Sequence, residues 1–239
     1  MVENLKITAL LTGRGNNTLK DKNILSVLNK PLLGYPCEAS RKSEYIQDFY
    51  VSSECDKILT TASDYGFSPL RRPKALALPN AQHEDVINHA IEYLIKKNKK
   101  PNILVVLLAN SVTVKTEWID ACIAHVLKDK QITASVPVYR ESDHHPFRAK
   151  KVNDQGYLEP FFDFQGRDIS TNRQDLIPAF FLSHNFWVLN LDTYKKGVGY
   201  KPWTFMGDKV KFLEVGEAFD VHTMEDIERS EKWVKKELL

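Results

Sequence analysis

An apolar segment runs directly into a basic, glycine-containing loop near the start of the chain, and this junction limits the folds that are available. Residues 7–11 are Ile-Thr-Ala-Leu-Leu, which is typical of a strand buried in a sheet. The loop at residues 13–22 contains two glycines, two asparagines and the basic residues Arg14, Lys20 and Lys22. Glycine lets backbone N–H groups turn toward an anion, and basic side chains neutralise its charge. The junction therefore predicts a nucleotide site, although it matches neither the Walker nor the dinucleotide glycine pattern.

Strand-like and helix-like segments alternate along the rest of the chain. We expect strands at residues 7–12, 46–53, 103–109, 132–139 and 180–190, and helices at 31–39, 55–62, 83–97, 117–127 and 224–238. Thr116 is expected to cap the helix that follows it. Strand–helix–strand units of this spacing form parallel sheets with right-handed crossovers. The pattern predicts an α/β fold with a mostly parallel central sheet that binds ligands at the carboxyl ends of its strands.

Composition excludes several classes of protein. With 239 residues, 43% of them hydrophobic and 27% charged, the chain suits one globular α/β domain. A net charge of +2, without basic runs interleaved with aromatics, argues against a nucleic-acid partner. The three cysteines show neither zinc-ligand nor disulfide spacing, which fits a reducing compartment. Because there is no signal-peptide pattern and no membrane-spanning apolar run, we expect a cytoplasmic protein without membrane contact.

Several short motifs resemble those of the CMP-acylneuraminate cytidylyltransferases. They are Arg14-Gly15-Asn16-Asn17, Lys22-Asn23-Ile24, Arg72-Pro73, His145-Pro146, Arg173-Gln174 and Asp220-Val221-His222-Thr223. The resemblance implies a Rossmann-like nucleotidyltransferase fold in a single domain, residues 1–239. It implies that residues 140–180, rich in aromatics and proline, form an inserted dimerisation arm, hereafter the arm. It also implies transfer of CMP from CTP to the anomeric hydroxyl of a sialic-acid-like 2-keto-3-deoxy sugar acid, with release of pyrophosphate.

The resemblance assigns roles to individual residues. It implies catalytic roles for Arg14, Lys22 and Asp220, nucleotide contacts for Leu11, Thr12, Gly13, Arg14, Asn16, Lys22, Asn23, Arg72 and Ala81, and sugar contacts for Asn110, Ser111, Arg173, Gln174 and His184. Asp220 and His222 are expected to hold Mg²⁺, with Mn²⁺ as the alternative because imidazole is a poor ligand for Mg²⁺. The expected partners are CTP, an acidic nonulosonic sugar and a second copy of the chain.

The sequence departs from the family pattern at some of these positions. The basic loop is one residue short and lacks the Ser-Lys-Gly of the family, so Lys20 is a candidate to replace the missing lysine. The other departures are Pro79 for an aspartate, Ala109 for a glutamine, Leu182 and His184 for an arginine and an asparagine, and His222 for the second aspartate of the metal site.

These departures leave alternatives open. One is a nucleotidyltransferase of the same fold that uses another nucleotide or another sugar. A second is a non-catalytic nucleotide-binding relative. At the level of single residues, Asp220 and Thr223 have a purely structural alternative, which is to cap the last helix.

Overall fold

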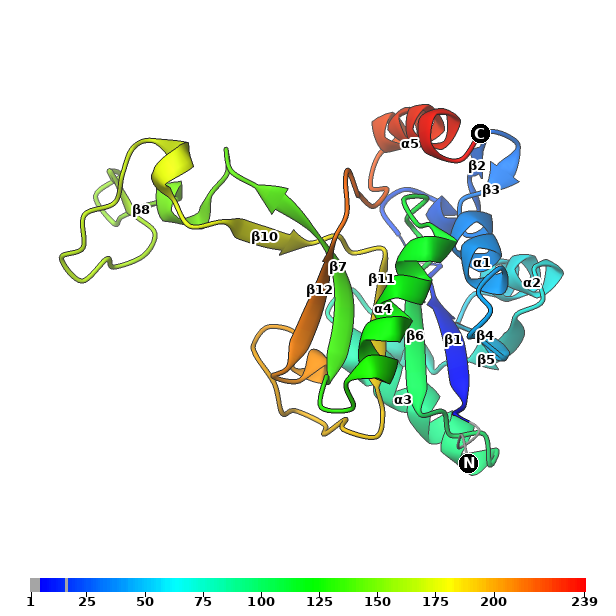
Figure 1. Ribbon diagram of the computed structural model, residues 1–239. Helices are drawn as coiled ribbons and strands as arrows, with labels where there is room; N and C mark the ends of the chain where they lie inside the picture. The colour runs from blue at the N-terminus through cyan, green and yellow to red at the C-terminus, as the bar shows by residue number, and fades with distance from the viewer. Residues whose placement is uncertain (1–4, 16) are drawn as a thin grey trace.

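The computed structural model describes residues 5–15 and 17–239, and its central feature is an eight-stranded sheet with helices on both faces (Figure 1). The strands of this sheet are β1 (Ile7–Thr12), β4 (Asp48–Ser53), β5 (Ser68–Arg71), β6 (Ile103–Leu108), β7 (Ala134–Glu141), β10 (Ala179–Leu182), β11 (Phe186–Asn190) and β12 (Val210–Glu214). Their order across the sheet is β10-β7-β11-β6-β1-β4-β5, and β12 pairs with β7. Strands β6, β1, β4 and β5 are parallel, whereas β11 runs antiparallel to β6. The expected α/β class with a mostly parallel sheet is confirmed.

The helices are α1 (Gly34–Arg41), α2 (Asp56–Asp64), α3 (His83–Lys96), α4 (Thr116–Lys128) and α5 (Met224–Glu237). Helices α1 to α4 connect and cover these strands, whereas α5 packs in a separate cluster with Val27, Leu32 and Tyr35. Two small antiparallel pairs complete the structure, β2 (Ser26–Val27) with β3 (Lys30–Pro31) and β8 (Lys150–Val152) with β9 (Leu158–Pro160). No helix in the described part of the chain is long and apolar enough to cross a membrane.

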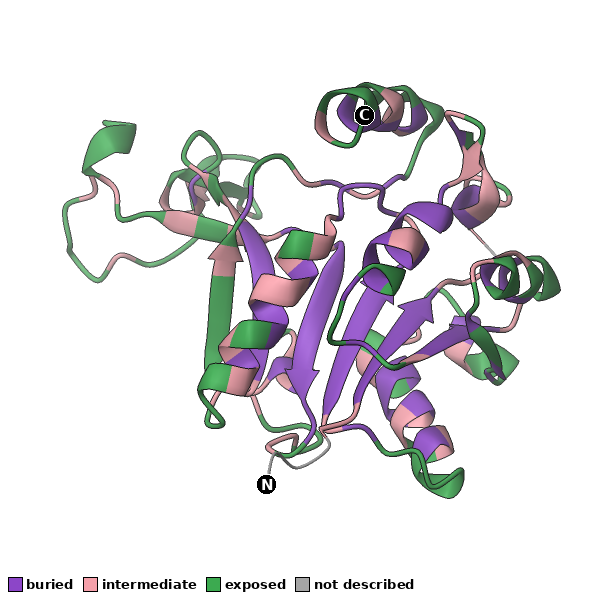
Figure 2. Ribbon diagram, turned by 45° about the vertical axis from the view of Figure 1, so that its right-hand side comes forward, coloured by how far each residue is buried: buried purple, intermediate pink, exposed green. Residues whose placement is uncertain are grey.

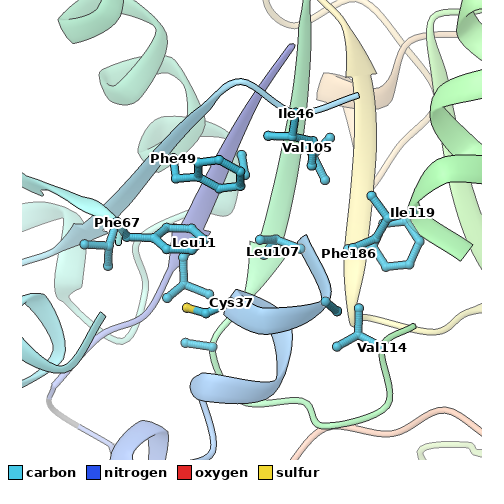
Figure 3. Close-up of a cluster of buried hydrophobic side chains, with 14 of the residues drawn as sticks. Leu11, Cys37, Ile46, Phe49, Phe67, Val105, Leu107, Val114, Ile119 and Phe186 are labelled. Atoms are coloured by element: carbon cyan, nitrogen blue, oxygen red, sulfur yellow. The ribbon is translucent and has the colours of Figure 1, made fainter. Parts of the chain in front are cut away.

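Alternation of side chains along the central strands creates two cores, one on each face of the sheet. Leu11, Leu107 and Phe186 point to the face covered by α1, α2 and α4, where Cys37 and Ile119 meet them (Figure 3). The even-numbered neighbours on β1 and β6 pack against α3 on the other face. Every residue of β1 and β6 is buried, and Figure 2 shows these strands at the centre of the molecule. A buried, rigid pair of strands thus fixes the position of the loops at their carboxyl ends.

The chain between residues 180 and 190 differs from the prediction of a single strand. It forms two strands, β10 and β11, because residues 183–185 leave the extended conformation and His184 has a φ of 48°. Strand β12 was not predicted. Thr116 does not cap α4 as expected, since Lys115 occupies that position and the Thr116 hydroxyl donates to the carbonyl of Ala39 at 2.9 Å.

The arm projects away from the sheet between β7 and β10 (Figure 1). Most of it is exposed, as Figure 2 shows, and its exposed residues include large apolar ones. Tyr157 and Leu158 are 68% and 72% exposed, and Phe161 is 54% exposed. Such a surface is unusual for a segment that touches only water.

Candidate active site

A cleft of about 550 Å³ opens where β1 and β6 end. Thr12 and Leu108, the last residues of these strands, lie in its wall. The remaining wall comes from the basic loop, the segment after β5 and the end segment before α5, with side chains that include Arg14, Lys22, Asn23, Arg72, Ala81, His83, Asn110 and His222. This is the edge at which open α/β sheets bind ligands.

The basic loop is held in place by an ion pair beneath it. Glu54 accepts a hydrogen bond from the backbone N–H of Gly15 at 2.7 Å and pairs with Arg72 at 3.1 Å. Arg72 also donates to the carbonyl of Gly13 at 2.9 Å, and only 5% of the residue is exposed. A Cβ on Gly15 would lie 2.6 Å from the Cβ of Cys55, so this position requires glycine. Arg72 therefore supports the loop as well as lining the cleft.

Replacing Arg72 with alanine is expected to lower the free energy of unfolding by about 3 kcal/mol, because it leaves Glu54 without its partner beneath the loop. Arg71→Ala is the matched control: its guanidinium is 57% exposed and pairs with Asp56 at the surface, so we expect a loss below about 1 kcal/mol. Urea denaturation of both variants measures the difference. Equal losses would show that the Glu54 pair does not support the loop.

Asparagines fix the backbone around Arg14. The side-chain amides of Asn17 and Asn23 donate to the carbonyl of Arg14 at 2.6 and 2.9 Å. The guanidinium of Arg14 donates to Asn17 at 3.2 Å and lines the cleft. Lys22 also lies in a wall of the cleft and is 9% exposed. Burial lowers the pKa of Lys22, and the charge of Asp220 partly opposes that shift.

Asp220 joins the end of β6 to the segment before α5. Its carboxylate accepts a hydrogen bond from Asn110 at 3.0 Å and lies 2.7 Å from Nε2 of His222. The backbone N–H of Val221 donates to the carbonyl of Asn110 at 2.8 Å, which closes the connection. Thr223, in contrast, caps α5 in a reciprocal pair with Asp226. The structural alternative thus holds for Thr223, whereas Asp220 takes no part in the cap.

A second cavity, of about 590 Å³, lies between the sheet and the segment that leads to α5. It is lined by Tyr139, Arg140, Glu141, Leu182, Ser183, His184, Glu214, Val215, Gly216, Glu217, Ala218, Phe219, Asp220 and Arg229. Asp220 lines this cavity while its partners Asn110 and His222 line the first. The contacts of Asp220 with Asn110 and His222 therefore link the two cavities.

The predicted site residues fall into two groups. The first cleft collects Thr12, Gly13, Arg14, Lys22, Asn23, Arg72, Ala81, Asn110 and His222, and the second cavity has Asp220 and His184. Asn16 lies outside the described residues. Lys20 is exposed and is not in the wall of either cavity.

Four predicted residues lie elsewhere. Leu11 is fully buried in the core, so only its backbone is available to a ligand. Ser111 is 1% exposed and donates to the carbonyl of Phe219 at 2.8 Å, a structural bond. Arg173 and Gln174 lie in the arm, where Arg173 pairs with Asp143 at 2.6 Å. None of these side chains lines either cavity. The expectation that the Ser111 side chain contacts the sugar is therefore corrected within this chain.

His83 was missed as a site residue. It lines the first cleft, its Nε2 lies 3.3 Å from the hydroxyl of Thr12, and its ring packs edge-on against Trp187. Desolvation of the ring and the positive charges of Arg72 and His184 lower its pKa, although the residue as a whole is exposed at the mouth of the cleft. The only signal in the sequence was its position, two residues after Ala81 at the start of α3.

A parallel-sheet edge with a basic loop, next to a second polar cavity, is the arrangement typical of α/β nucleotide-binding proteins. A family model described as "Cytidylyltransferase" matches residues 14–195, well over half of the chain. The chain therefore belongs to the cytidylyltransferase family, which confirms the family resemblance of its motifs.

Similar curated proteins come from several bacteria. An N-acylneuraminate cytidylyltransferase of Escherichia coli O18:K1:H7 is 36% identical over 36% of this chain and 21% of its own length. The bifunctional pseudaminic acid cytidylyltransferase of Helicobacter pylori is 33% identical over 39% of this chain and 18% of that protein. An N-acylneuraminate cytidylyltransferase of Streptococcus agalactiae serotype V is 24% identical over 75% of this chain. The chain matches at most 42% of the length of these three relatives.

Solved structures share the fold. A CMP:2-keto-3-deoxy-manno-octonic acid synthetase complexed with CTP superposes with a TM-score of 0.69 at 15% identity, covering 98% of this chain and all of that one. A 4-diphosphocytidyl-2C-methyl-D-erythritol synthase from Anaerococcus prevotii gives 0.64 at 14% identity, covering 97% and 99%. These similarities confirm the nucleotidyltransferase fold.

Proposed function

We propose that this protein transfers CMP from CTP to the anomeric hydroxyl of a sialic-acid-like 2-keto-3-deoxy sugar acid and releases pyrophosphate. The observation that carries the proposal is a pair of cavities linked through the contacts of Asp220, one lined by the basic loop and one not. A transferase needs two adjacent substrate sites, whereas a protein that only binds a nucleotide needs one. The similar N-acylneuraminate and pseudaminic acid cytidylyltransferases support the choice of CTP and an acidic sugar.

In this proposal the first cleft holds the nucleotide. Arg14 and Lys22 contact the triphosphate, and the backbone N–H groups of the loop contribute further donors. Asn23 and Ala81 border the part of the cleft that accepts the cytidine, and Arg72 fixes the position of the loop through the carbonyl of Gly13. Phosphoryl transfer of this kind depends chiefly on positioning and on stabilising charge.

A divalent cation fits the residues present, although they do not form a complete cage. No group of three His, Cys, Asp or Glu side chains that could hold a metal ion occurs among residues 5–15 and 17–239. Mg²⁺ is commonly held by one or two carboxylates together with substrate phosphates, so Asp220 suffices once a triphosphate is bound. His222, 2.7 Å from that carboxylate, is the second candidate ligand and suits Mn²⁺ better. The cation would stabilise the charge that develops on the departing pyrophosphate.

Pyrophosphate release tests the proposed function directly. The protein is incubated with CTP, Mg²⁺ or Mn²⁺ and a panel of nonulosonic acids and 2-keto-3-deoxyoctonate. Release that requires both CTP and an acidic sugar is the expected result. Release with ATP, GTP or UTP in place of CTP would favour another nucleotidyltransferase activity. If protein that is folded and binds nucleotide releases no pyrophosphate with any sugar of the panel, the non-catalytic alternative is favoured.

We also propose that the arm forms a homodimer and carries Arg173 toward the sugar site of the partner. The exposed apolar residues of the arm support a contact with another protein surface. Arginine can bind a sugar carboxylate through two parallel hydrogen bonds, and Arg173 does not line either cavity of its own chain.

Leu158→Lys is expected to convert a dimer to a monomer, because it places a charge among the apolar residues of the arm. Tyr200→Lys is the matched control, since Leu158 and Tyr200 are both 72% exposed and Tyr200 lies outside the arm. Light scattering during size-exclusion chromatography measures the mass of each variant. A wild-type monomer, or a dimer that survives Leu158→Lys, would contradict the proposed role of the arm.

A further inference from the structure

The link between β10 and β11 holds His184 in a conformation that L-residues rarely adopt. Its φ of 48° lies in the left-handed region, where few residues other than glycine and asparagine are found. Conformations of this kind persist only when the surrounding structure fixes them, and they gather at functional sites.

Buried polar neighbours fix this link on both sides. Ser183 is 2% exposed, its backbone N–H donates to the carbonyl of Pro137 at 3.1 Å, and its hydroxyl lies 2.8 Å from Oδ1 of Asn185. Asn185 is fully buried and donates to the carbonyl of Thr113 at 2.5 Å. Because both flanking residues are anchored in the core, the direction of the His184 side chain is set by the fold.

The imidazole of His184 is held by aromatic rings and makes no polar contact with the described protein. Its ring centroid lies 5.4 Å from that of Trp203 and 6.2 Å from that of Trp187. It lines the second cavity together with Asp220. No hydrogen bond from residues 5–15 or 17–239 reaches either ring nitrogen, so both remain available to a ligand.

Each of the other histidines of the site has one ring nitrogen in a polar contact. Nε2 of His83 lies 3.3 Å from the hydroxyl of Thr12, and Nε2 of His222 lies 2.7 Å from the carboxylate of Asp220. Attack of a sugar hydroxyl on a phosphate requires that its proton be accepted by a base within reach. Among the three imidazoles around the two cavities, His184 is the one with both ring nitrogens free within the described structure, and it is the one that lines the second cavity.

We propose that His184 is the general base of the transfer reaction, an inference that rests on the proposed function. The anomeric oxygen of the sugar acid attacks the α-phosphorus of CTP, and a new O–P bond forms as its proton passes to an unprotonated ring nitrogen of His184. The bond between the α-phosphorus and the bridging oxygen breaks, and its electron pair leaves with pyrophosphate. The imidazolium then releases the proton to solvent.

The charges around His184 are compatible with this role. Burial lowers its pKa below 6.5, while Asp220, on the segment before α5, opposes the shift. His83 on α3 is the other titratable group near the ring. The remaining titratable groups that line the cavity are Tyr139, Arg140, Glu141, Glu214, Glu217 and Arg229. The imidazole is therefore mainly neutral, and able to accept a proton, at physiological pH.

His184→Asn tests the proposal, because asparagine tolerates the left-handed conformation but cannot act as a base at neutral pH. We expect kcat for pyrophosphate release to fall about 100-fold or more, with a small change in KM for the sugar, and the acidic limb of the pH profile to disappear. His89→Asn is the matched control, since the pKa of His89 is also lowered by burial but its side chain lines neither cavity. That control should keep both the rate and the acidic limb.

His184→Gly provides a second test that does not depend on how asparagine packs. Glycine adopts a positive φ readily, and removal of the ring leaves space beside Trp203. Added imidazole should restore pyrophosphate release in this variant in proportion to the neutral imidazole present, and should not affect His184→Asn. Circular dichroism and CTP binding confirm that each variant is folded.

The outcomes separate this inference from the proposed function. If the wild-type protein releases no pyrophosphate with any sugar acid, the proposed function is wrong and the inference falls with it. If the wild type is active but His184→Asn raises KM for the sugar while kcat and the acidic limb persist, His184 only contacts the sugar. Absence of imidazole rescue in folded, CTP-binding His184→Gly would likewise overturn the role as base.

Discussion

Asp220→Asn is expected to lower kcat for pyrophosphate release by about 10²- to 10³-fold while leaving the free energy of unfolding nearly unchanged. Asp220 lines the second cavity and contacts His222 of the first, and in the proposed reaction its charge is needed chiefly when a cation and the triphosphate are present. Asparagine keeps the size of the side chain and can still bond to Asn110, so the local packing survives. Steady-state kinetics and urea denaturation of the same preparation measure the two effects.

Asp226→Asn is the matched control, a substitution of the same type six residues along the chain. Asp226 accepts hydrogen bonds from the backbone N–H groups of His222 and Thr223, each at 2.8 Å, and so begins α5. We expect this variant to lose about 1 kcal/mol of stability and to keep most of its activity. If Asp220→Asn instead lost stability in step with activity, Asp220 would be a structural residue and not a ligand.

The contribution of Asp226 to stability should depend on pH. Burial opposes ionisation of Asp226, but hydrogen bonds from His222 and Thr223 outweigh it and hold its pKa below 3.8. A carboxyl group whose pKa is lower in the folded state stabilises the protein above its unfolded pKa, and this contribution is lost as the pH falls through the folded value. The stability difference between wild type and Asp226→Asn should therefore shrink below about pH 4.

The part of the site that follows β1 could be predicted from the sequence because local patterns determine it. An uninterrupted apolar run requires a strand that is buried on both faces, and the glycines and basic residues after it require a loop open to an anion. Parallel packing then brings the end of β6, and with it Asn110, to the same edge. These inferences need only periodicity and the rules of sheet topology.

The parts that escaped prediction depend on contacts between distant segments. The break at His184 is stabilised by Thr113 and Pro137, which lie 72 and 46 residues from their partners in the chain. Arg72 supports the loop through its ion pair with Glu54, which lies in a different connection of the chain between strands. Ser111 resembled a ligand contact in the sequence, but the carbonyl of Phe219, 108 residues away, satisfies it in the core. Residue type alone cannot distinguish a polar group facing a ligand from one facing its own protein.

Lys22→Met is expected to lower kcat/KM for CTP by about 10³-fold, since it removes a cation that the proposal places against the triphosphate. The same change should raise the free energy of unfolding by about 1 kcal/mol, because Lys22 is buried without a carboxylate partner among the described residues. Lys20→Met is the matched control: Lys20 is exposed and outside the cleft, so both quantities should stay close to wild type.

The gain in stability should itself depend on pH, which separates burial of a charge from a simple improvement in packing. Burial lowers the pKa of Lys22 below 10.5, with Asp220 opposing the shift, so the folded protein holds this proton less tightly than the unfolded chain. The charged lysine therefore costs stability at neutral pH, and the cost fades as the pH rises toward 10.5. The advantage of Lys22→Met should shrink over the same range in urea titrations. If the stability advantage of Lys22→Met is the same at every pH, it comes from better packing. If Lys22→Met loses both stability and activity, Lys22 supports the loop, and its burial does not cost the protein stability.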